Sequence, residues 1–282
     1  MLMTMLSCFG VNWKISEIGG VKYVPLVQVG EFFNLEKIED EEGDAVLRNK
    51  ELTLRFLKGA KDAILNNVKF KLKHPVEVVE GAAFLSNFDL VKMIDPVLRP
   101  SKVTGLQGVK TVFLDPAIDR EFRGKDAIVN EMAEALKRRG FEVVVLEAKG
   151  ERMRVAEQLR KIGEGERGIF LQLELGGGKK SLMRTTTVGS NLEPSVAMST
   201  ALHWTVIQRL SGSGTAALTI GDQGISIGDQ AGYEKLTIPG ARVVLRLDKA
   251  LASRDILGRG IADALFFARK AGGELARPDE KK

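Results

Sequence analysis

The sequence Thr111-Val-Phe-Leu114 opens the stretch that decides the fold, which runs to Gln172 and reads strand, loop, helix, strand, helix, strand. Phe141-Glu-Val-Val-Val-Leu146 and Gly168-Ile-Phe-Leu-Gln-Leu173 are two further apolar runs, and both are expected to be buried strands. Between the first two runs, apolar residues recur at helical spacing until a basic turn and Gly140 end the helix. Strands that alternate with helices of this length predict parallel crossover units.

The polar segments that leave these strands are the places where function is expected, because ligands of parallel sheets bind beyond the C-terminal strand ends. These segments are 115–121 and 174–180. Further strands are expected at 181–187 and 241–245, and an amphipathic helix is expected at 255–270. The expected fold class is therefore α/β, with a mixed, mainly parallel sheet flanked by helices.

The N-terminal third has a different pattern. Alternating apolar and polar residues indicate a small sheet with one solvent-exposed face. A pattern of strand, tight turn, strand and short helix appears twice, at 22–33 and at 78–93. Pro96 and Pro100 predict an extended linker at 94–101, because proline lacks the N–H that a helix needs. The expected domains are a small α+β domain over 1–100, the α/β domain over 101–275 and a tail over 276–282.

The composition excludes several classes of protein. The net charge of +5 favours anionic surroundings, but Lys and Arg are interspersed with Asp and Glu rather than clustered, so no nucleic-acid partner is expected. The single cysteine, Cys8, excludes an internal disulfide and a cysteine-based zinc cluster. No apolar run reaches the roughly 18–20 residues that span a bilayer. The apolar segment Met1–Cys8 lacks a basic start, so a strand is favoured over a signal-peptide remnant or a lipid-attachment cysteine.

Two segments of the N-terminal third carry a family resemblance: Gly20-Val-Lys-Tyr-Val-Pro-Leu26 and Glu80-Gly-Ala-Ala-Phe-Leu-Ser86. They resemble the copper amine oxidase N-terminal-like domain over about Val21–Leu98. Despite its name, that domain is often a non-catalytic, wall-associated module. His74 is the only histidine in this region, and a single imidazole makes no metal site.

The later part of the chain carries a second resemblance. Its residues are Val112-Phe-Leu-Asp-Pro116, Leu136-Lys-Arg-Arg-Gly-Phe-Glu-Val-Val143, Ile169-Phe-Leu-Gln-Leu173 and Tyr233-Glu-Lys-Leu-Thr-Ile-Pro239. Over about Val109–Lys270 they resemble the zinc-dependent N-acetylmuramoyl-L-alanine amidases. That family cleaves the amide between N-acetylmuramic acid and the first alanine of the peptidoglycan stem peptide. It uses a His-Glu-His zinc site and a further Glu that handles the proton.

The resemblance places other residue types at these positions. Ile118 stands at the first zinc histidine, Glu174 at the second, and Arg246 at the catalytic Glu. The zinc Glu matches Glu121 when counted back from Arg139-Gly140, but Gly124 when counted from Lys125-Asp126. Neither His74 nor His203 lies near a matching position. No cofactor is therefore expected, although the resembled family binds zinc.

The candidate cleft residues are Asp115, Ile118, Asp119, Glu121, Glu174 and Arg246. If a metal binds, Asp115, Glu121 and Glu174 are the oxygen ligands, and they suit magnesium, manganese or calcium better than zinc. The favoured alternative is a salt bridge between Arg246 and Glu174 that fills the emptied site, or simple solvation of these groups.

A basic loop follows the third strand of the later part, at Gly176-Gly-Gly-Lys-Lys180. It lacks the glycine and the Ser or Thr that a phosphate-binding P-loop needs, so it is interpreted as flexible. Lys179, Lys180 and Arg184 are candidate contacts for stem-peptide carboxylates. The alternative for them is a role in surface solubility.

The resulting hypothesis is a bacterial, wall-associated, catalytically degenerate amidase homologue that binds peptidoglycan or stem peptides, or regulates a partner. One alternative is an active amidase with an atypical metal site. The other is an interaction scaffold for a protein partner or homo-oligomer, without a wall ligand. The resemblance implies the periplasm or cell envelope, but no clear signal peptide is present, so a cytoplasmic location stays open.

Overall fold

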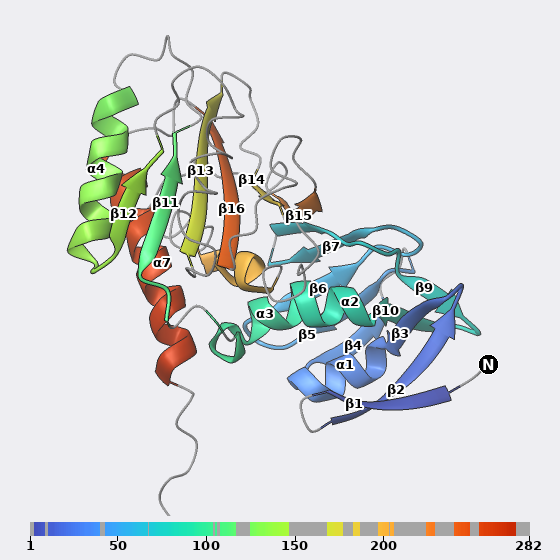
Figure 1. The fold of residues 1–282 in the computed structure, drawn as a ribbon. Helices are drawn as coiled ribbons and strands as arrows, with labels where there is room; N and C mark the ends of the chain where they lie inside the picture. Colours follow the sequence, from blue (N-terminus) through green and yellow to red (C-terminus); the bar gives the residue numbers. More distant parts are fainter. Residues whose placement is uncertain are drawn as a thin grey trace, which may run out of the picture. The chain divides into compact units, whose positions relative to one another are not determined.

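A computed structural model describes the chain at residues 3–8, 11–39, 43–66, 68–103, 105, 108–116, 125–146, 168–176, 183–186, 197–202, 204–205, 224–228, 240–248 and 254–274. The chain divides into two compact units, Met1–Leu98 and Arg99–Lys282. Both units contain strands and helices (Figure 1). The coarse prediction of a protein that mixes helices with sheets is therefore confirmed.

The first sheet of the N-terminal unit has five antiparallel strands in the order β1-β2-β3-β10-β9. They are β1 (Met3–Cys8), β2 (Val11–Ile18), β3 (Val21–Pro25), β10 (Ala82–Ser86) and β9 (Glu77–Val79). The apolar N-terminal segment is thus a strand, as favoured from the sequence. Two helices follow strands of this sheet directly, α1 (Leu26–Phe33) after β3 and α2 (Asn87–Asp89) after β10.

The N-terminal unit contains two similar hairpins, each followed by a helix. The second matches the pattern predicted at 78–93, whereas the first begins with β2, before the predicted range 22–33. β2 and β3 join through Gly19 and Gly20, with φ of 57° and 77°, and β9 and β10 join through Glu80 and Gly81, with φ of 52° and 78°. Positive φ at both central residues is the turn geometry that matches the twist of paired strands. β3 and β10 pair antiparallel, so the two copies meet in the middle of the sheet.

The second sheet of this unit is an antiparallel meander. Its strands are β4 (Glu36–Glu39), β5 (Ala45–Arg48), β6 (Thr53–Phe56), β7 (Asp62–Leu65) and β8 (Val68–Lys71). In β8 the buried residues Val68 and Phe70 alternate with the exposed residues Lys69 and Lys71. The prediction of one solvent-exposed face is confirmed by this alternation.

The segment expected to be an extended linker is helical. α2 continues into a π-helical turn, Leu90–Ile94, and then into α3, Asp95–Leu98, while Pro100–Lys102 forms a 3-10 turn. The linker prediction is wrong, because Pro96 lies within α3 of this continuous helical segment. The widened π turn before it, with the Asp95 N–H bonded to the Leu90 carbonyl, accommodates the proline.

The C-terminal unit contains four parallel strands in the order β12-β11-β13-β16. They are β12 (Glu142–Val145), β11 (Thr111–Asp115), β13 (Gly168–Gly176) and β16 (Gly240–Asp248). β14 (Met183–Thr186) pairs antiparallel with β16, and β15 (Gly224–Gly228) pairs parallel with β14. Most strand pairs in the described chain are antiparallel, and parallel pairing is found among these four strands and between β14 and β15.

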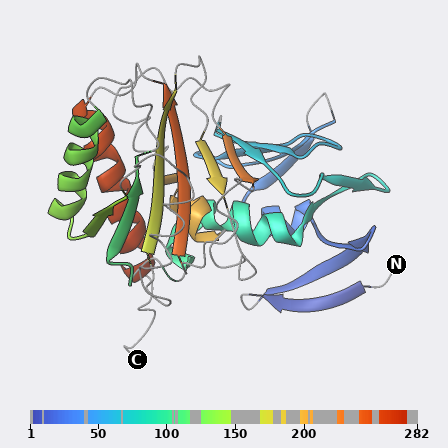
Figure 2. The ribbon, with the colours of Figure 1, turned by 45° about the horizontal axis from the view of Figure 1, so that its top comes forward.

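α4 (Lys125–Arg138) and α7 (Arg254–Glu274) lie side by side next to β12 (Figures 1 and 2). The apolar face predicted for α4 is buried, with 0–6% exposure at Ile128, Val129, Met132, Ala135 and Leu136. Gly140, with φ of 77°, ends α4 as predicted. The prediction of a buried second strand is wrong, since Val144 and Val145 of β12 are 37% and 39% exposed. An apolar run alone does not distinguish a central strand from one at the edge of the described sheet.

Candidate functional site

The predicted site lies at the C-terminal part of the parallel strands, where β11 and β13 bring two polar residues together. Asp115 is the last residue of β11, and the strand register places it beside Gln172 of β13. Their side chains are almost fully buried, at 2% and 1% exposure. Residues in register on neighbouring strands share a face of the sheet. The structure therefore forms a buried polar pair, of which the sequence analysis named only Asp115.

A close fit between β11 and β13 sets this register. All five residues of β11 are buried. A Cβ built on Gly168, the first residue of β13, would lie 2.3 Å from Cε2 of the fully buried Phe113 ring. Because no larger residue fits beneath this ring, glycine at 168 allows the two strands to pair with Thr111 opposite Gly168 and Asp115 opposite Gln172.

The second pair of positions joins β13 to β16. Glu174 is half-buried, and the register places it opposite Arg246. The sequence pattern predicts that Glu174 lies beyond the end of its strand, but β13 continues to Gly176 and β16 continues to Asp248. Both residues therefore lie within strands. A carboxylate and a guanidinium at register-matched positions of one sheet are an attractive combination.

The other predicted site residues are not brought together by the described structure. Arg184 lies in β14 at the position in register with Val244 of β16. Ile118, Asp119, Glu121, Lys179 and Lys180 lie outside the described residues, so their predicted roles stay predictions. Gln172 was overlooked, although a glutamine inside the apolar run Ile169-Phe-Leu-Gln-Leu173 was a visible signal of a special position.

The described residues contain no group of three or more His, Cys, Asp or Glu side chains placed to hold a metal ion. Asp115 and Glu174 are both within this part of the chain, but the third proposed ligand, Glu121, is not. The expectation that no metal binds therefore stays a prediction.

His74 has a structural role in the N-terminal unit. Asp89, whose side chain is buried, accepts the N–H of Lys73 at 2.7 Å and the N–H of His74 at 3.0 Å. It also accepts the Ser86 hydroxyl at 2.6 Å, and the Ser86 oxygen caps α2 by accepting the Asp89 N–H. Burial raises the pKa of the Asp89 carboxyl, and these hydrogen bonds partly offset that rise. The loop that carries His74 is thus fixed through its backbone.

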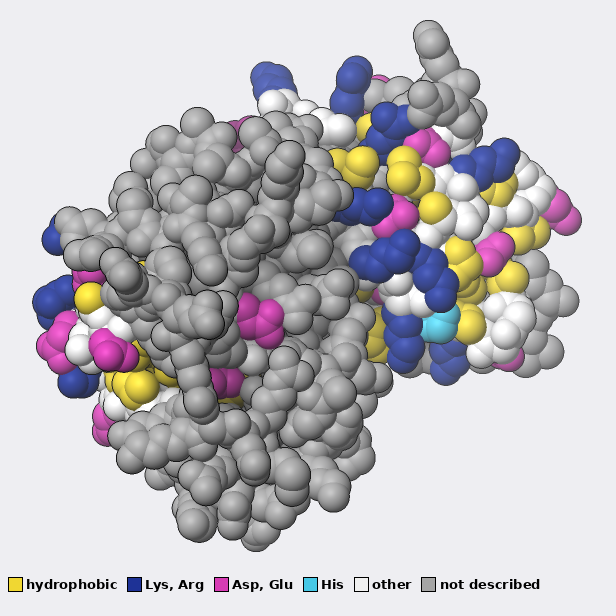
Figure 3. Space-filling view, turned by 90° about the horizontal axis from the view of Figure 1, so that it is seen from above, with side chains coloured by type: hydrophobic (Ala, Val, Ile, Leu, Met, Phe, Trp, Pro, Cys, Tyr) yellow, Lys and Arg dark blue, Asp and Glu magenta, His cyan; other side chains and the backbone are white. Residues whose placement is uncertain are grey.

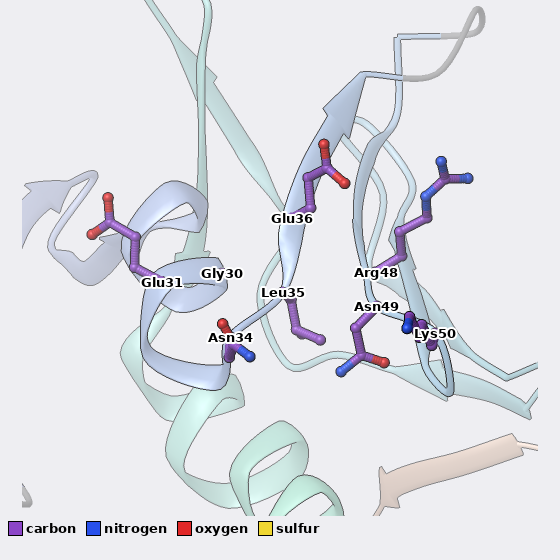
Figure 4. Close-up of a pocket in the computed structure, with 8 residues that line it drawn as sticks. All are labelled: Gly30, Glu31, Asn34, Leu35, Glu36, Arg48, Asn49 and Lys50. Atoms are coloured by element: carbon purple, nitrogen blue, oxygen red, sulfur yellow. The ribbon is translucent and has the colours of Figure 1, made fainter.

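A polar hollow of about 570 Å³ lies in the same unit, between the end of α1 and the turn after β5 (Figure 4). Glu31 and Arg48 lie on opposite sides of it. Asn34 ends α1 with φ of 54°, and a Cβ at Gly30 would lie 2.8 Å from the Leu35 carbonyl oxygen. The lining includes both signs of charge, so the hollow favours no one kind of ion. It is lined by Gly30, Glu31, Asn34, Leu35, Glu36, Arg48, Asn49 and Lys50.

No family model matches the chain, and no curated protein matches it. Among the described helices, none is long and apolar enough to cross a membrane.

Proposed function

We propose that the chain is a bacterial cell-wall protein of the periplasm or cell envelope that binds peptidoglycan without hydrolysing it. Its C-terminal unit would have the architecture of the N-acetylmuramoyl-L-alanine amidases. The N-terminal unit would be a wall-associated module of the copper amine oxidase N-terminal-like kind. The order of strands and helices at Thr111–Asp115, Lys125–Arg138, Glu142–Val145 and Gly168–Gly176 supports this proposal.

The register of Glu174 with Arg246 is the observation that carries the proposal. In the resembled family these two positions hold a zinc ligand and the catalytic carboxylate. Here they would hold a carboxylate and a guanidinium, whose opposite charges would favour an ion pair. A guanidinium stays protonated at neutral pH, so Arg246 would not serve as the base that activates water. The site would then lack the proton acceptor that amide hydrolysis requires.

Binding would use charge rather than covalent chemistry. Stem peptides carry free carboxylates, and Arg184, Lys179 and Lys180 follow β13 in the sequence. In this proposal these cations hold the carboxylates of the stem peptide near the C-terminal part of the parallel strands. The buried pair of Asp115 and Gln172 would fix the strands beneath that site.

The test combines sedimentation with purified sacculi, an assay for released stem peptides with zinc or manganese supplied, and elemental analysis of the protein. We expect sedimentation with sacculi, no release and no stoichiometric metal. Metal-dependent release that disappears in Glu174→Ala would replace this proposal with an active amidase. Failure to sediment, with a mass that rises with concentration in light scattering, would replace it with a protein-interaction scaffold.

A double-mutant cycle tests the pair itself. Glu174→Ala, Arg246→Ala and the double variant should give an interaction energy of about 0.5–3 kcal/mol if the two side chains attract each other. Arg184→Ala, which changes a cation on the neighbouring strand β14, is the matched control. An interaction energy near zero for Glu174 and Arg246 would remove the main support for an emptied metal site.

A further inference from the structure

The positive charge of this protein is concentrated in one segment of the N-terminal unit. Residues 53–76 contain six Lys or Arg and one acidic residue, Asp62, so their net charge of +5 equals that of the whole chain. This corrects the expectation that basic and acidic residues are interspersed throughout. The segment spans β6, β7, β8 and the loop after β8. In Figure 3, dark-blue Lys and Arg side chains gather around the cyan histidine.

Strand β8 places Lys69 and Lys71 on one face, and Lys73 continues the alternation in the loop after the strand. Val68, Phe70 and Leu72 are buried, whereas Lys69, Lys71 and Lys73 alternate with them and are exposed. Successive lysines on this face are about 6.6–6.8 Å apart along the strand. We call Lys69, Lys71 and Lys73 the lysine row.

Local contacts hold the lysine row in place and leave it positive. The Nζ atoms of Lys69 and Lys71 lie 3.3 and 3.2 Å from the same Asp62 Oδ1, so one carboxylate serves two cations. Their side chains remain 50% and 55% exposed. Lys73 Nζ lies 4.3 Å from the centre of the Phe88 ring, which orients this side chain without neutralising it.

We propose that the lysine row docks the N-terminal unit onto an anionic phospholipid surface. Lysine is a flexible point charge, suited to a diffuse anionic surface, whereas specific phosphate recognition favours the planar fork of arginine. Arg55 is the arginine of residues 53–76, and its Nε is held by Asp44 Oδ2 at 2.8 Å. Phe56 and Phe70 are the aromatic residues of this segment, and both are fully buried. These two phenylalanine rings are therefore not available for the base stacking that single-stranded nucleic acids use.

The proposal does not depend on the proposed peptidoglycan function. Its test is co-sedimentation of the full chain with vesicles containing phosphatidylglycerol, compared with pure phosphatidylcholine vesicles. Binding is expected only to the anionic vesicles, and it should weaken as salt is added. Equal binding to both vesicle types, or to neither, would overturn the proposal.

Variants that remove either positive or negative charge from the lysine row and its surroundings make the test specific. Each lysine near a membrane surface is worth about fivefold in partitioning, so replacing Lys69, Lys71 and Lys73 together by Gln should weaken binding about a hundredfold. The single variants Lys69→Gln and Lys71→Gln should each weaken it about fivefold, which covers the case of a poorly folded triple variant. Asp62→Asn removes the acidic group of this face and should tighten binding about fivefold.

The matched control replaces Lys14, Lys22 and Lys110, which are exposed and lie outside the segment, by Gln. This control changes the total charge equally and should leave binding close to that of the unchanged protein. An equal loss in the control would show attraction by overall charge and overturn the proposal. Duplex DNA that outcompetes the anionic vesicles for the protein would overturn it in favour of a nucleic-acid partner.

Discussion

The replacement of Asp89 by Asn tests whether one buried carboxylate organises the N-terminal unit. Asp89 is fully buried and accepts three hydrogen bonds, two from the backbone N–H groups of Lys73 and His74 and one from the Ser86 hydroxyl. Oδ1 accepts from Lys73, while Oδ2 accepts from His74 and Ser86. An asparagine side chain has one acceptor oxygen, so either orientation turns an NH₂ group toward a backbone N–H.

The expected cost follows from counting the donors left without an acceptor. One buried donor without a partner costs about 1–3 kcal/mol, and removal of the charge relieves part of the desolvation cost of the carboxylate. We therefore expect Asp89→Asn to lower the free energy of unfolding by about 2 kcal/mol. Asp89→Ala leaves both backbone donors unsatisfied and should cost about 4 kcal/mol.

The assay is urea unfolding, combined with hydrogen exchange at the amides of Lys73 and His74. One of these amides should lose protection in Asp89→Asn, and both should lose it in Asp89→Ala. Asp62→Asn is the matched control, because its ion pairs with Lys69 and Lys71 are at the surface and should contribute less than about 1 kcal/mol. The reasoning fails if Asp89→Asn is no more destabilising than Asp62→Asn, or if the two amides keep their protection.

Three further predictions concern pH, packing and helix ends. Burial raises the pKa of Asp89 above its ordinary value near 3.8, so the folded protein binds a proton there at a higher pH than the unfolded chain does. As the pH falls through the raised pKa toward 3.8, the free energy of unfolding of the unchanged protein should therefore rise relative to that of Asp89→Asn. The measurement is urea unfolding of both proteins at several pH values, and a decrease in this difference would contradict the prediction. In thermal unfolding, Gly168→Ala should destabilise the C-terminal unit by about 1–3 kcal/mol, because the alanine Cβ would overlap the Phe113 ring. Gly108→Ala is the control in the same experiment, because no neighbouring atom lies within 4 Å of the position of its Cβ. Arg269→Ala should lower the free energy of unfolding by about 1–2 kcal/mol, because the guanidinium donates to the carbonyls of Arg139 and Gly140 and lies 4.2 Å from the centre of the Phe141 ring. Arg269→Lys should recover only part of this loss.

The elements with strong local patterns were predictable from the sequence. The sequence predicts α4 from its apolar spacing and Gly140, and the hairpin of β9 and β10 from its Glu80-Gly81 turn. β2, β4 and β5 were missed. In β2 the alternation is brief, because the exposed Lys14 lies between the buried Trp13 and Ile15 but Ser16 is buried as well. β4 and β5 have only four residues each, and strands this short gain their stability from their partners rather than from their own sequence.

Features that depend on neighbouring strands were not predictable from local patterns. The exposure of Val144 and Val145 follows from the position of β12 beside a single described strand, which an apolar run does not reveal. The helical turns around Pro96 depend on the preceding π turn. In the site, the position of Glu174 within β13 follows from the length over which β13 pairs with β16. The sequence pattern therefore indicates strand β13 but not the residue at which it ends.

Under the proposed function, the nine-residue pairing of β13 with β16 explains why an arginine is a suitable replacement at position 246. Glu174 places a carboxylate where the resembled family has a zinc histidine, and a charge in a partly buried place is costly unless it is compensated. Glu174 is half-buried and lies within the paired part of the strands rather than on a loop that is free to move away. A cation supplied by the protein at the register-matched position would compensate this charge permanently. The same substitution would remove the proton acceptor, so stability of the emptied site and loss of hydrolysis would arise from one residue.

Arg246→Glu should therefore destabilise the C-terminal unit through repulsion with Glu174, and Arg246→Lys should be tolerated, as thermal unfolding of the two variants would show. Equal stability of these two variants would mean that the pair plays no part in the site.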